Sequence, residues 1–172
     1  MFMILRFFYN PSLEISPLPC YLASILFFKK IQNSEMLMKI ACLLSSPRKN
    51  GNSSYLAKRI CEKASAQGAE VQYFNLNTLN YKGCQACMAC KSGSEKCVIP
   101  DDLANVLDSA AEADLLLLAT PVYFGDISAQ LKAFVDRTFS YIVPDFYFSD
   151  IKSRLKPGKK LLFVLTQGHE DK

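Results

Sequence analysis

The chain has 172 residues, of which 50% are hydrophobic and 21% are charged, and its net charge is +4. This composition is typical of a single globular domain and excludes a disordered or fibrous protein. No basic block interleaved with aromatic residues is present, so we expect no nucleic-acid partner. The seven cysteines are an odd number, which does not match the paired framework of a small secreted domain. We therefore expect a cytoplasmic protein.

The N-terminal residues 1–35 are apolar but are interrupted by Pro11, Pro17 and Pro19. The longest mostly apolar run in this segment, 21–28, has eight residues, whereas a helix that spans a bilayer needs about 20. We therefore expect no membrane span. The segment is interpreted as an N-terminal extension outside the fold, and residues 36–172 as the functional domain.

The rest of the chain alternates between predicted strands and predicted helices. Short apolar runs without helical periodicity predict buried strands, and apolar residues spaced three or four apart predict helices. In chain order we expect strand 38–44, helix 55–68, strand 69–76, helix 100–112, strand 113–120, helix 128–142 and strand 159–168. This alternation predicts an α/β fold in which a doubly wound parallel sheet is covered by helices on both faces.

Open α/β sheets bind their ligands at the carboxyl ends of the strands, where the loops 45–54, 120–127 and 166–170 are expected. The first loop, "SSPRKNGNSS", leads from a strand into a helix, so its backbone N–H groups favour an anion. Its side chains suit a phosphate group: Ser46, Arg48, Asn50, Asn52, Ser53 and Ser54. It lacks both the Gly-Lys-Ser/Thr ending of nucleotide-triphosphate loops and the G-x-G-x-x-G of dinucleotide folds. The alternative is a polar loop with an ordinary helix cap.

The second loop, "TPVYFGDIS", covers residues 120–128. Pro121 is expected to end the preceding strand, Tyr123 and Phe124 offer flat apolar surface, and Gly125 allows close backbone approach. An aromatic pair opposite a phosphate site suits a planar ring that carries a phosphate tail. The alternative is that the two aromatic side chains only pack against the protein.

Four cysteines are crowded into "GCQACMACKSGSEKC", at Cys84, Cys87, Cys90 and Cys97. Thiolates at such close spacing can converge on one centre, and soft sulfur ligands select an iron–sulfur cluster or zinc. Structural zinc usually takes cysteine pairs from separated segments. Disulfides between near neighbours do not fit a reducing cytoplasm. Free or redox-active thiols are a further alternative.

Three segments taken together resemble a known family: "MKIACLLSSPRKNGNSSYLAKRI", "GCQACMACKSGSEKCVIPDD" and "ADLLLLATPVYFGDISAQLKAFVDRT". They are similar to the NADPH-dependent FMN reductase family of flavodoxin-like folds, and within it to the iron–sulfur flavoproteins. The resemblance runs from about residue 38 to residue 168. The family fold has a fifth strand and a closing helix beyond the fourth strand, which this sequence lacks. Without them, the apolar run "LLFVL" at 161–165 is expected to form an open sheet edge that can pair with a strand of another chain.

The resemblance implies an FMN cofactor with its phosphate in the loop 46–54. It also implies a [4Fe–4S] cluster on Cys84, Cys87, Cys90 and Cys97, and a homo-oligomer. The flavin ring would lie against residues of two loops: Pro121, Val122, Tyr123, Phe124, Gly125, Gln167 and Gly168. The pair Asp136–Arg137 matches the family's helix pattern and is interpreted as structural.

These features favour an oxidoreductase, a redox flavoprotein whose chemistry is carried by FMN, so no catalytic side chain is expected. Electrons would pass between a reduced carrier, such as ferredoxin or NAD(P)H, and an acceptor by way of the cluster. One alternative is a cluster-free NAD(P)H-dependent FMN or quinone-type reductase. Another is a non-catalytic flavodoxin-like fragment.

Overall fold

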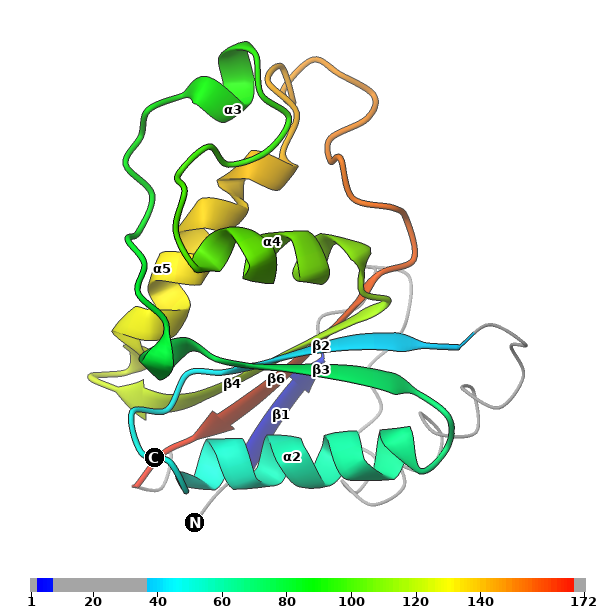
Figure 1. Ribbon diagram of the computed structural model, residues 1–172, viewed down its shortest axis with the longest axis vertical. Coiled ribbons are helices and arrows are strands. Elements are labelled where there is room, and N and C mark those ends of the chain that lie inside the picture. Colours follow the sequence, from blue (N-terminus) through cyan, green and yellow to red (C-terminus); the bar gives the residue numbers. More distant parts are fainter. Residues whose placement is uncertain (1–2, 8–36, 169–172) are drawn as a thin grey trace.

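The computed structural model describes residues 3–7 and 37–168, which form one sheet with helices packed on both of its faces (Figure 1). The strands are β1 (Met3–Phe7), β2 (Lys39–Leu44), β3 (Glu70–Asn75), β4 (Leu115–Tyr123), β5 (Asp126–Ile127) and β6 (Lys160–Thr166). The helices are α2 (Asn52–Ser65), α3 (Ala89–Ser92), α4 (Leu103–Glu112) and α5 (Ala129–Arg137), with short 3₁₀ helices η1 (Leu76–Thr78) and η2 (Thr138–Tyr141).

The centre of the sheet is parallel. Its strands follow the order β1-β6-β4-β2-β3, with β5 paired to β4 alone. β2 lies parallel to both β3 and β4, and β4 lies parallel to β6. If the four parallel strands β2, β3, β4 and β6 are numbered 1 to 4 along the chain, they lie side by side in the order 2-1-3-4. This is the strand order of a flavodoxin-like sheet. The predicted α/β class is confirmed.

The core forms two layers because successive residues of a strand point to opposite faces of the sheet. On one face, Ile40 and Cys42 of β2 pack with α2, through Ala57 and Cys61. On the other face, a separate buried cluster contains Leu43 of β2 and side chains of α4 and α5. Figure 1 shows α2 below the sheet and α4 and α5 above it.

The expected elements are all present, but two of their boundaries differ in an instructive way. The strand predicted to end at Pro121 continues to Tyr123, because Val122 and Tyr123 pair with β5 in a tight hairpin. Proline removes one N–H donor but does not prevent this continuation. The helix predicted over 128–142 ends at Arg137, and the chain then tightens into η2.

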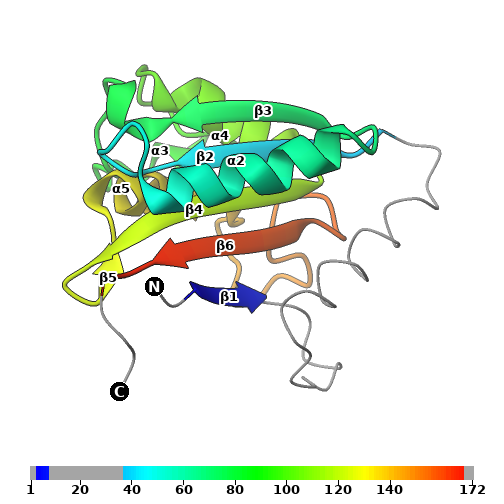
Figure 2. The ribbon, with the colours of Figure 1, turned by 90° about the horizontal axis from the view of Figure 1, so that it is seen from below.

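The outer edge of β6 is occupied by β1, which pairs with it antiparallel from Met3 opposite Thr166 to Phe7 opposite Leu162. Part of the segment expected outside the fold therefore covers the apolar edge that was expected to be open (Figure 2). Residues 8–36 lie outside the described residues, so the boundary at residue 36 stays a prediction. None of the described helices is long and apolar enough to cross a membrane.

Deleting residues 1–7 should uncover the β6 edge and increase self-association, because an unpaired apolar strand offers free backbone groups to another chain. Light scattering after size-exclusion chromatography would measure the effect. The control is the same deletion combined with Leu165→Lys, since an edge lysine opposes strand pairing. A deletion variant that elutes as the full chain does would contradict this role of β1.

Candidate functional site

Three loops leave the sheet at the same edge. In the sheet register, Leu44 of β2 lies opposite Ala119 of β4, and Pro121 of β4 lies opposite Thr166 of β6. The loop 45–51, the β4–β5 hairpin and the Gln167–Gly168 turn therefore follow neighbouring strand ends. Figures 1 and 2 both show them on one side of the molecule, where the predicted ligand edge lies. The structure thus brings the sequence-predicted flavin residues to one edge.

The loop before α2 is folded tightly around Gly51. The Gly51 N–H donates to the Arg48 carbonyl over 3.1 Å, and the Arg48 N–H donates to Ser46 Oγ over 3.2 Å. A Cβ atom at position 51 would lie only 2.3 Å from Ser46 Oγ, so any larger residue there would force the Ser46 side chain to shift. The turn leaves the side chains of Arg48, Asn50 and Asn52 exposed.

The N-terminus of α2 is suited to an anion. Its N-cap residue, Gly51, supplies no side-chain cap, and its first turn contains no acidic residue. Ser53 is 1% exposed, and its Oγ has no hydrogen-bond partner among the described residues. A buried hydroxyl without a partner is unfavourable by about 1–3 kcal/mol. An anion at the helix N-terminus would give this hydroxyl a partner and would interact favourably with the helix dipole.

A buried hydroxyl network joins the first loop to the second. Ser45 Oγ donates to the Ala119 carbonyl over 2.9 Å, and Ser128 Oγ donates to Ser45 Oγ over 3.0 Å. The Ser128 N–H donates to Thr120 Oγ1 over 3.0 Å. Ser128 is also the N-cap of α5. The relative position of the two loops is therefore fixed by hydrogen bonds that are shielded from water.

The β4–β5 hairpin presents the predicted ring-binding residues. Phe124 is fully exposed and has a φ of 50°, and Gly125 follows with a φ of 79°. Left-handed backbone at a bulky residue is unfavourable and occurs mainly where surrounding structure or a ligand requires it. Tyr123 is 47% exposed, whereas Pro121 and Val122 are half-buried. The hairpin thus offers apolar surface next to the loop 45–51.

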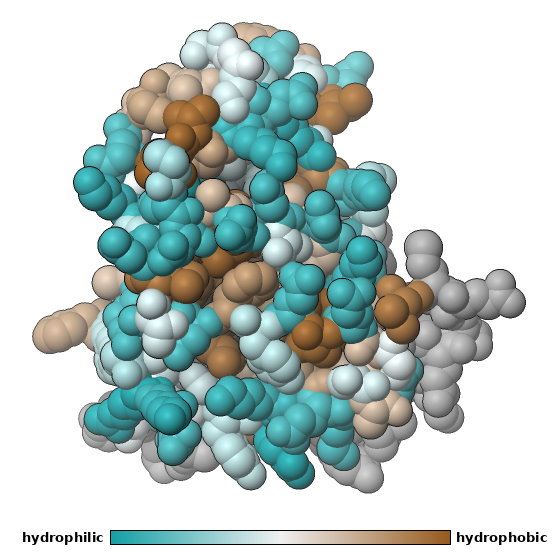
Figure 3. All heavy atoms as spheres, in the orientation of Figure 1, coloured by the Kyte–Doolittle hydropathy of each residue, from teal (hydrophilic) through white to brown (hydrophobic). Residues whose placement is uncertain are grey.

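The four cysteines of the loop between β3 and α4 line a single pocket, together with Val98, Ile99, Phe139, Ser140 and the buried side chain of Arg137. Cys84 and Cys87 are exposed, Cys90 and Cys97 are half-buried, and all four are free thiols. Within the described ranges, no three metal-ligating side chains lie in positions to bind an ion. Figure 3 shows hydrophobic side chains reaching the surface around α3, where Met88 and Val98 are exposed.

The backbone between the first three cysteines is left-handed at two residues that are not glycine. Ala86 has a φ of 51°, and Met88 has a φ of 59°. Such a conformation is unfavourable by roughly 1–2 kcal/mol per residue. It turns the chain twice between Cys84 and Cys90, which lets three cysteines line the same pocket.

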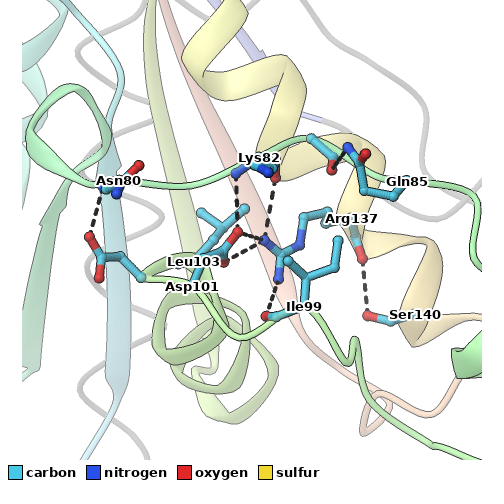
Figure 4. Close-up of polar contacts among 10 residues, drawn as sticks. Asn80, Lys82, Gln85, Ile99, Asp101, Leu103, Arg137 and Ser140 are labelled. Atoms are coloured by element: carbon cyan, nitrogen blue, oxygen red, sulfur yellow. Dashed lines mark hydrogen bonds and ion pairs between the residues drawn. The ribbon is translucent and has the colours of Figure 1, made fainter.

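The two ends of the cysteine loop are held together by a buried ion pair (Figure 4). Arg137 Nη1 contacts Asp101 Oδ1 at 2.5 Å and Oδ2 at 2.6 Å, and the Arg137 side chain is fully buried. Arg137 also donates to the carbonyls of Lys82 and Ile99. Burial raises the pKa of Asp101, but hydrogen bonds from Arg137 and from the N–H groups of Lys82 and Leu103 outweigh it, so this pKa lies below its usual value.

The short helix α3 is fastened to the segment that follows α5. Lys91 Nζ donates to the carbonyls of Phe139 and Ile142 and lies 4.0 Å from the centre of the Phe139 ring. Arg154 donates to the Cys90 carbonyl over 3.1 Å. The cysteine loop is therefore held at its ends by Arg137 and in its middle by Lys91 and Arg154.

Comparison with known proteins identifies the family. The model of the NADPH-dependent FMN reductase family matches residues 38–170, which is most of the chain. The chain therefore belongs to that family. The parallel sheet with its flanking helices is the flavodoxin-like fold that the sequence predicts.

Two kinds of curated relatives are similar to the chain. An iron-sulfur flavoprotein of Methanocaldococcus jannaschii is 37% identical over 101 residues, covering 59% of this chain and 52% of that protein. One of Methanosarcina thermophila is 36% identical over 101 residues, with the same coverage. A Bacillus subtilis protein named as an NAD(P)H-dependent FMN-containing oxidoreductase is 28% identical over 134 residues, covering 78% of this chain and 68% of that protein. The chain spans about half the length of the iron-sulfur flavoproteins it matches.

Among solved structures, the apo form of an NADH:FMN oxidoreductase superposes with a TM-score of 0.46 and 23% identity. The match covers 61% of this chain and 53% of that chain.

Sequence reasoning missed the contacts that hold the site together. The sequence interprets Asp136 and Arg137 as structural residues without naming their partners, and the structure pairs Asp136 with Lys132 and Arg137 with Asp101. The available signal was an arginine on an otherwise apolar helix face, since a buried arginine requires a carboxylate partner. The steric requirement at Gly51 carries no sequence signal beyond the glycine itself.

Gly51→Ala should lower the free energy of unfolding by about 1–3 kcal/mol, because the added Cβ overlaps Ser46 Oγ and the buried turn must shift. Gly93→Ala is the matched control, because no atom lies within 4 Å of its added Cβ. Urea unfolding measures both variants. Equal stability of the two variants would contradict the tight turn.

Proposed function

We propose that the chain is the FMN-binding part of a redox flavoprotein that passes electrons between a reduced carrier and an acceptor. The main support for the flavin site is the buried Ser53 hydroxyl, which has no hydrogen-bond partner among the described residues and lies at the uncapped N-terminus of α2. The phosphate of FMN fits this position, because it supplies acceptor oxygens and negative charge. Family membership supports the same cofactor.

The remaining predicted residues have complementary roles in this proposal. Ser46, Ser53 and Ser54 line the buried side of the loop, while Arg48, Asn50 and Asn52 are on its exposed side. Pro121, Val122, Tyr123, Phe124, Gly125, Gln167 and Gly168 would contact the ring. Bound FMN supplies one- and two-electron redox chemistry. The protein's own contribution is to bind the phosphate, to orient the ring and to exclude water from one of its faces.

Ser53→Ala should weaken FMN binding about 10- to 150-fold while leaving the apo protein as stable as before or more stable. The variant removes a donor to the phosphate, worth about 1.5–3 kcal/mol, and also removes a buried hydroxyl that has no partner. Fluorescence titration measures binding, and urea unfolding of the apo protein measures stability.

Riboflavin, which lacks the phosphate, is the control ligand, and its affinity should not change. Equal losses of affinity for FMN and riboflavin would contradict the phosphate site at Ser53. A large loss of apo stability would show that the hydroxyl has a structural role.

We propose further that Cys84, Cys87, Cys90 and Cys97 bind a [4Fe–4S] cluster. The supporting observation is that all four line one pocket, although they are up to 13 positions apart along the chain (97 − 84 = 13). The left-handed residues Ala86 and Met88 support it too, because such strain persists where surrounding structure or a ligand requires it. The iron-sulfur flavoprotein relatives point to the same group.

The cluster would accept single electrons, so a one-electron carrier such as ferredoxin suits it as donor, while a reduced nicotinamide would deliver two electrons to the flavin as hydride. The name of the matched Bacillus subtilis relative includes NAD(P)H, which agrees with the second donor; a cluster-free reductase is the alternative function. Iron content distinguishes the two functions. A homo-oligomer and a cytoplasmic location remain part of the proposal.

Replacing Cys84, Cys87, Cys90 or Cys97 singly by Ala should each remove most of the bound iron and sulfide from anaerobically prepared protein. A cubane cluster needs four thiolate ligands, and alanine supplies none. Cys42→Ala and Cys61→Ala are the controls, because these buried cysteines lie in the core beside α2 and should leave iron unchanged. Iron, sulfide and flavin are quantified in the same samples.

FMN content should largely survive in all six variants, because the phosphate loop and the β4–β5 hairpin lie on other segments. If Cys61→Ala loses as much iron as the variants of the four pocket cysteines, the assignment of these four cysteines as cluster ligands is wrong. If the protein contains stoichiometric zinc and neither iron nor sulfide, the four cysteines bind zinc and not a cluster.

A further inference from the structure

We propose that Arg137 sets the reduction potential of the cysteine-bound cluster, by placing its positive charge and its free Nε–H group in the pocket that the four cysteines line. This inference rests on the cluster proposed above. It assigns Arg137 as a positioning residue for electron transfer and not only as part of a structural ion pair.

The first observation is the place of Arg137. Its side chain is fully buried, and it lines the same pocket as all four cysteines. A guanidinium carries five N–H donors in a fixed plane. Nη1 and Nη2 are directed to Asp101, Lys82 and Ile99. These partners hold the plane of the group.

The second observation is an unused donor. Arg137 Nε is buried and has no hydrogen-bond partner among the described residues. Such a group is unfavourable inside a protein unless a ligand or an ion satisfies it. An arginine side chain stays protonated in proteins, so a positive charge and an unused N–H donor both lie in the pocket that the four cysteines line.

The consequence follows from electrostatics. When the cluster takes up one electron from an external reduced carrier, its charge becomes more negative by one unit and no bond is broken. A fixed cation and an N–H donor in the cluster's pocket would therefore stabilise the reduced form more than the oxidised form. Net charge and hydrogen bonds to sulfur are the means by which proteins adjust such potentials.

The partner residue allows a test that separates this role from a structural one. Arg137 and Asp101 form one ion pair, so any structural effect of breaking it should act in the same direction for both variants. The electrostatic effects are opposite. Asp101→Asn removes a negative charge near the cluster and keeps the arginine, whereas Arg137→Gln removes the cation and keeps the carboxylate.

The experiment is an anaerobic redox titration of the wild-type protein, Asp101→Asn and Arg137→Gln, followed by electron paramagnetic resonance of the reduced cluster. At a fixed potential, the ratio of reduced to oxidised cluster should rise about tenfold in Asp101→Asn and fall about tenfold in Arg137→Gln. Each tenfold change corresponds to about 59 mV for a one-electron couple. Shifts of the same sign, or none in either variant, would overturn the inference.

Arg137→Gln leaves a buried carboxylate without its partner and can fail to hold the cluster. In that case Asp101→Asn/Arg137→Gln is compared with Asp101→Asn, because these two proteins differ only at position 137. The double variant should show a ratio about tenfold lower, and an equal ratio would overturn the inference. Wild-type protein without iron and sulfide would instead contradict the cluster itself, so the two failures are distinguishable.

Discussion

The buried ion pair between Arg137 and Asp101 is the contact on which the cysteine pocket depends. It joins the last residue of α5 to the turn before α4, and through Lys82 and Ile99 it closes the loop that carries all four cysteines. Removing one partner of such a buried pair typically destabilises a protein by about 3–5 kcal/mol, because the other charge is left without compensation. Pairing two ions in the interior is favourable only when further hydrogen bonds complete it. Here the backbone groups of the loop provide those bonds.

The same helix connects the two candidate redox sites. At its N-terminus, Ser128 caps α5 and binds Ser45 in the loop of the proposed phosphate site. At its C-terminus, Arg137 lies in the cysteine pocket. Nine helical residues span about 13 Å, so the helix places the two sites at a fixed separation. A rigid element that holds both candidate sites would keep their separation constant during the proposed electron transfer, and preorganised polar groups would not need to rearrange.

The sequence predicts the fold well because the fold depends on local patterns. The runs 40–44 and 115–119 are continuously apolar and too short for a typical buried helix, which favours strands buried on both faces. The loop 45–54 and the spacing of the four cysteines can also be recognised within one short continuous segment of the sequence. The Arg137–Asp101 pair is not predictable in this way, because its partners are 36 positions apart and nothing in either segment specifies the other. The pairing of β1 with β6 likewise depends on contacts between distant segments, whereas the continuation of β4 past Pro121 depends on the local hairpin with β5.

We propose that one chain positions both a flavin and an iron–sulfur cluster. The most direct test is an anaerobic absorption spectrum of the purified protein, combined with iron, sulfide and flavin analysis. We expect about four iron and four sulfide for each FMN, with the broad absorbance of a [4Fe–4S] centre beneath the flavin bands. Protein that contains flavin but neither iron nor sulfide, even after anaerobic reconstitution, would contradict it and leave the cysteine loop without a cluster.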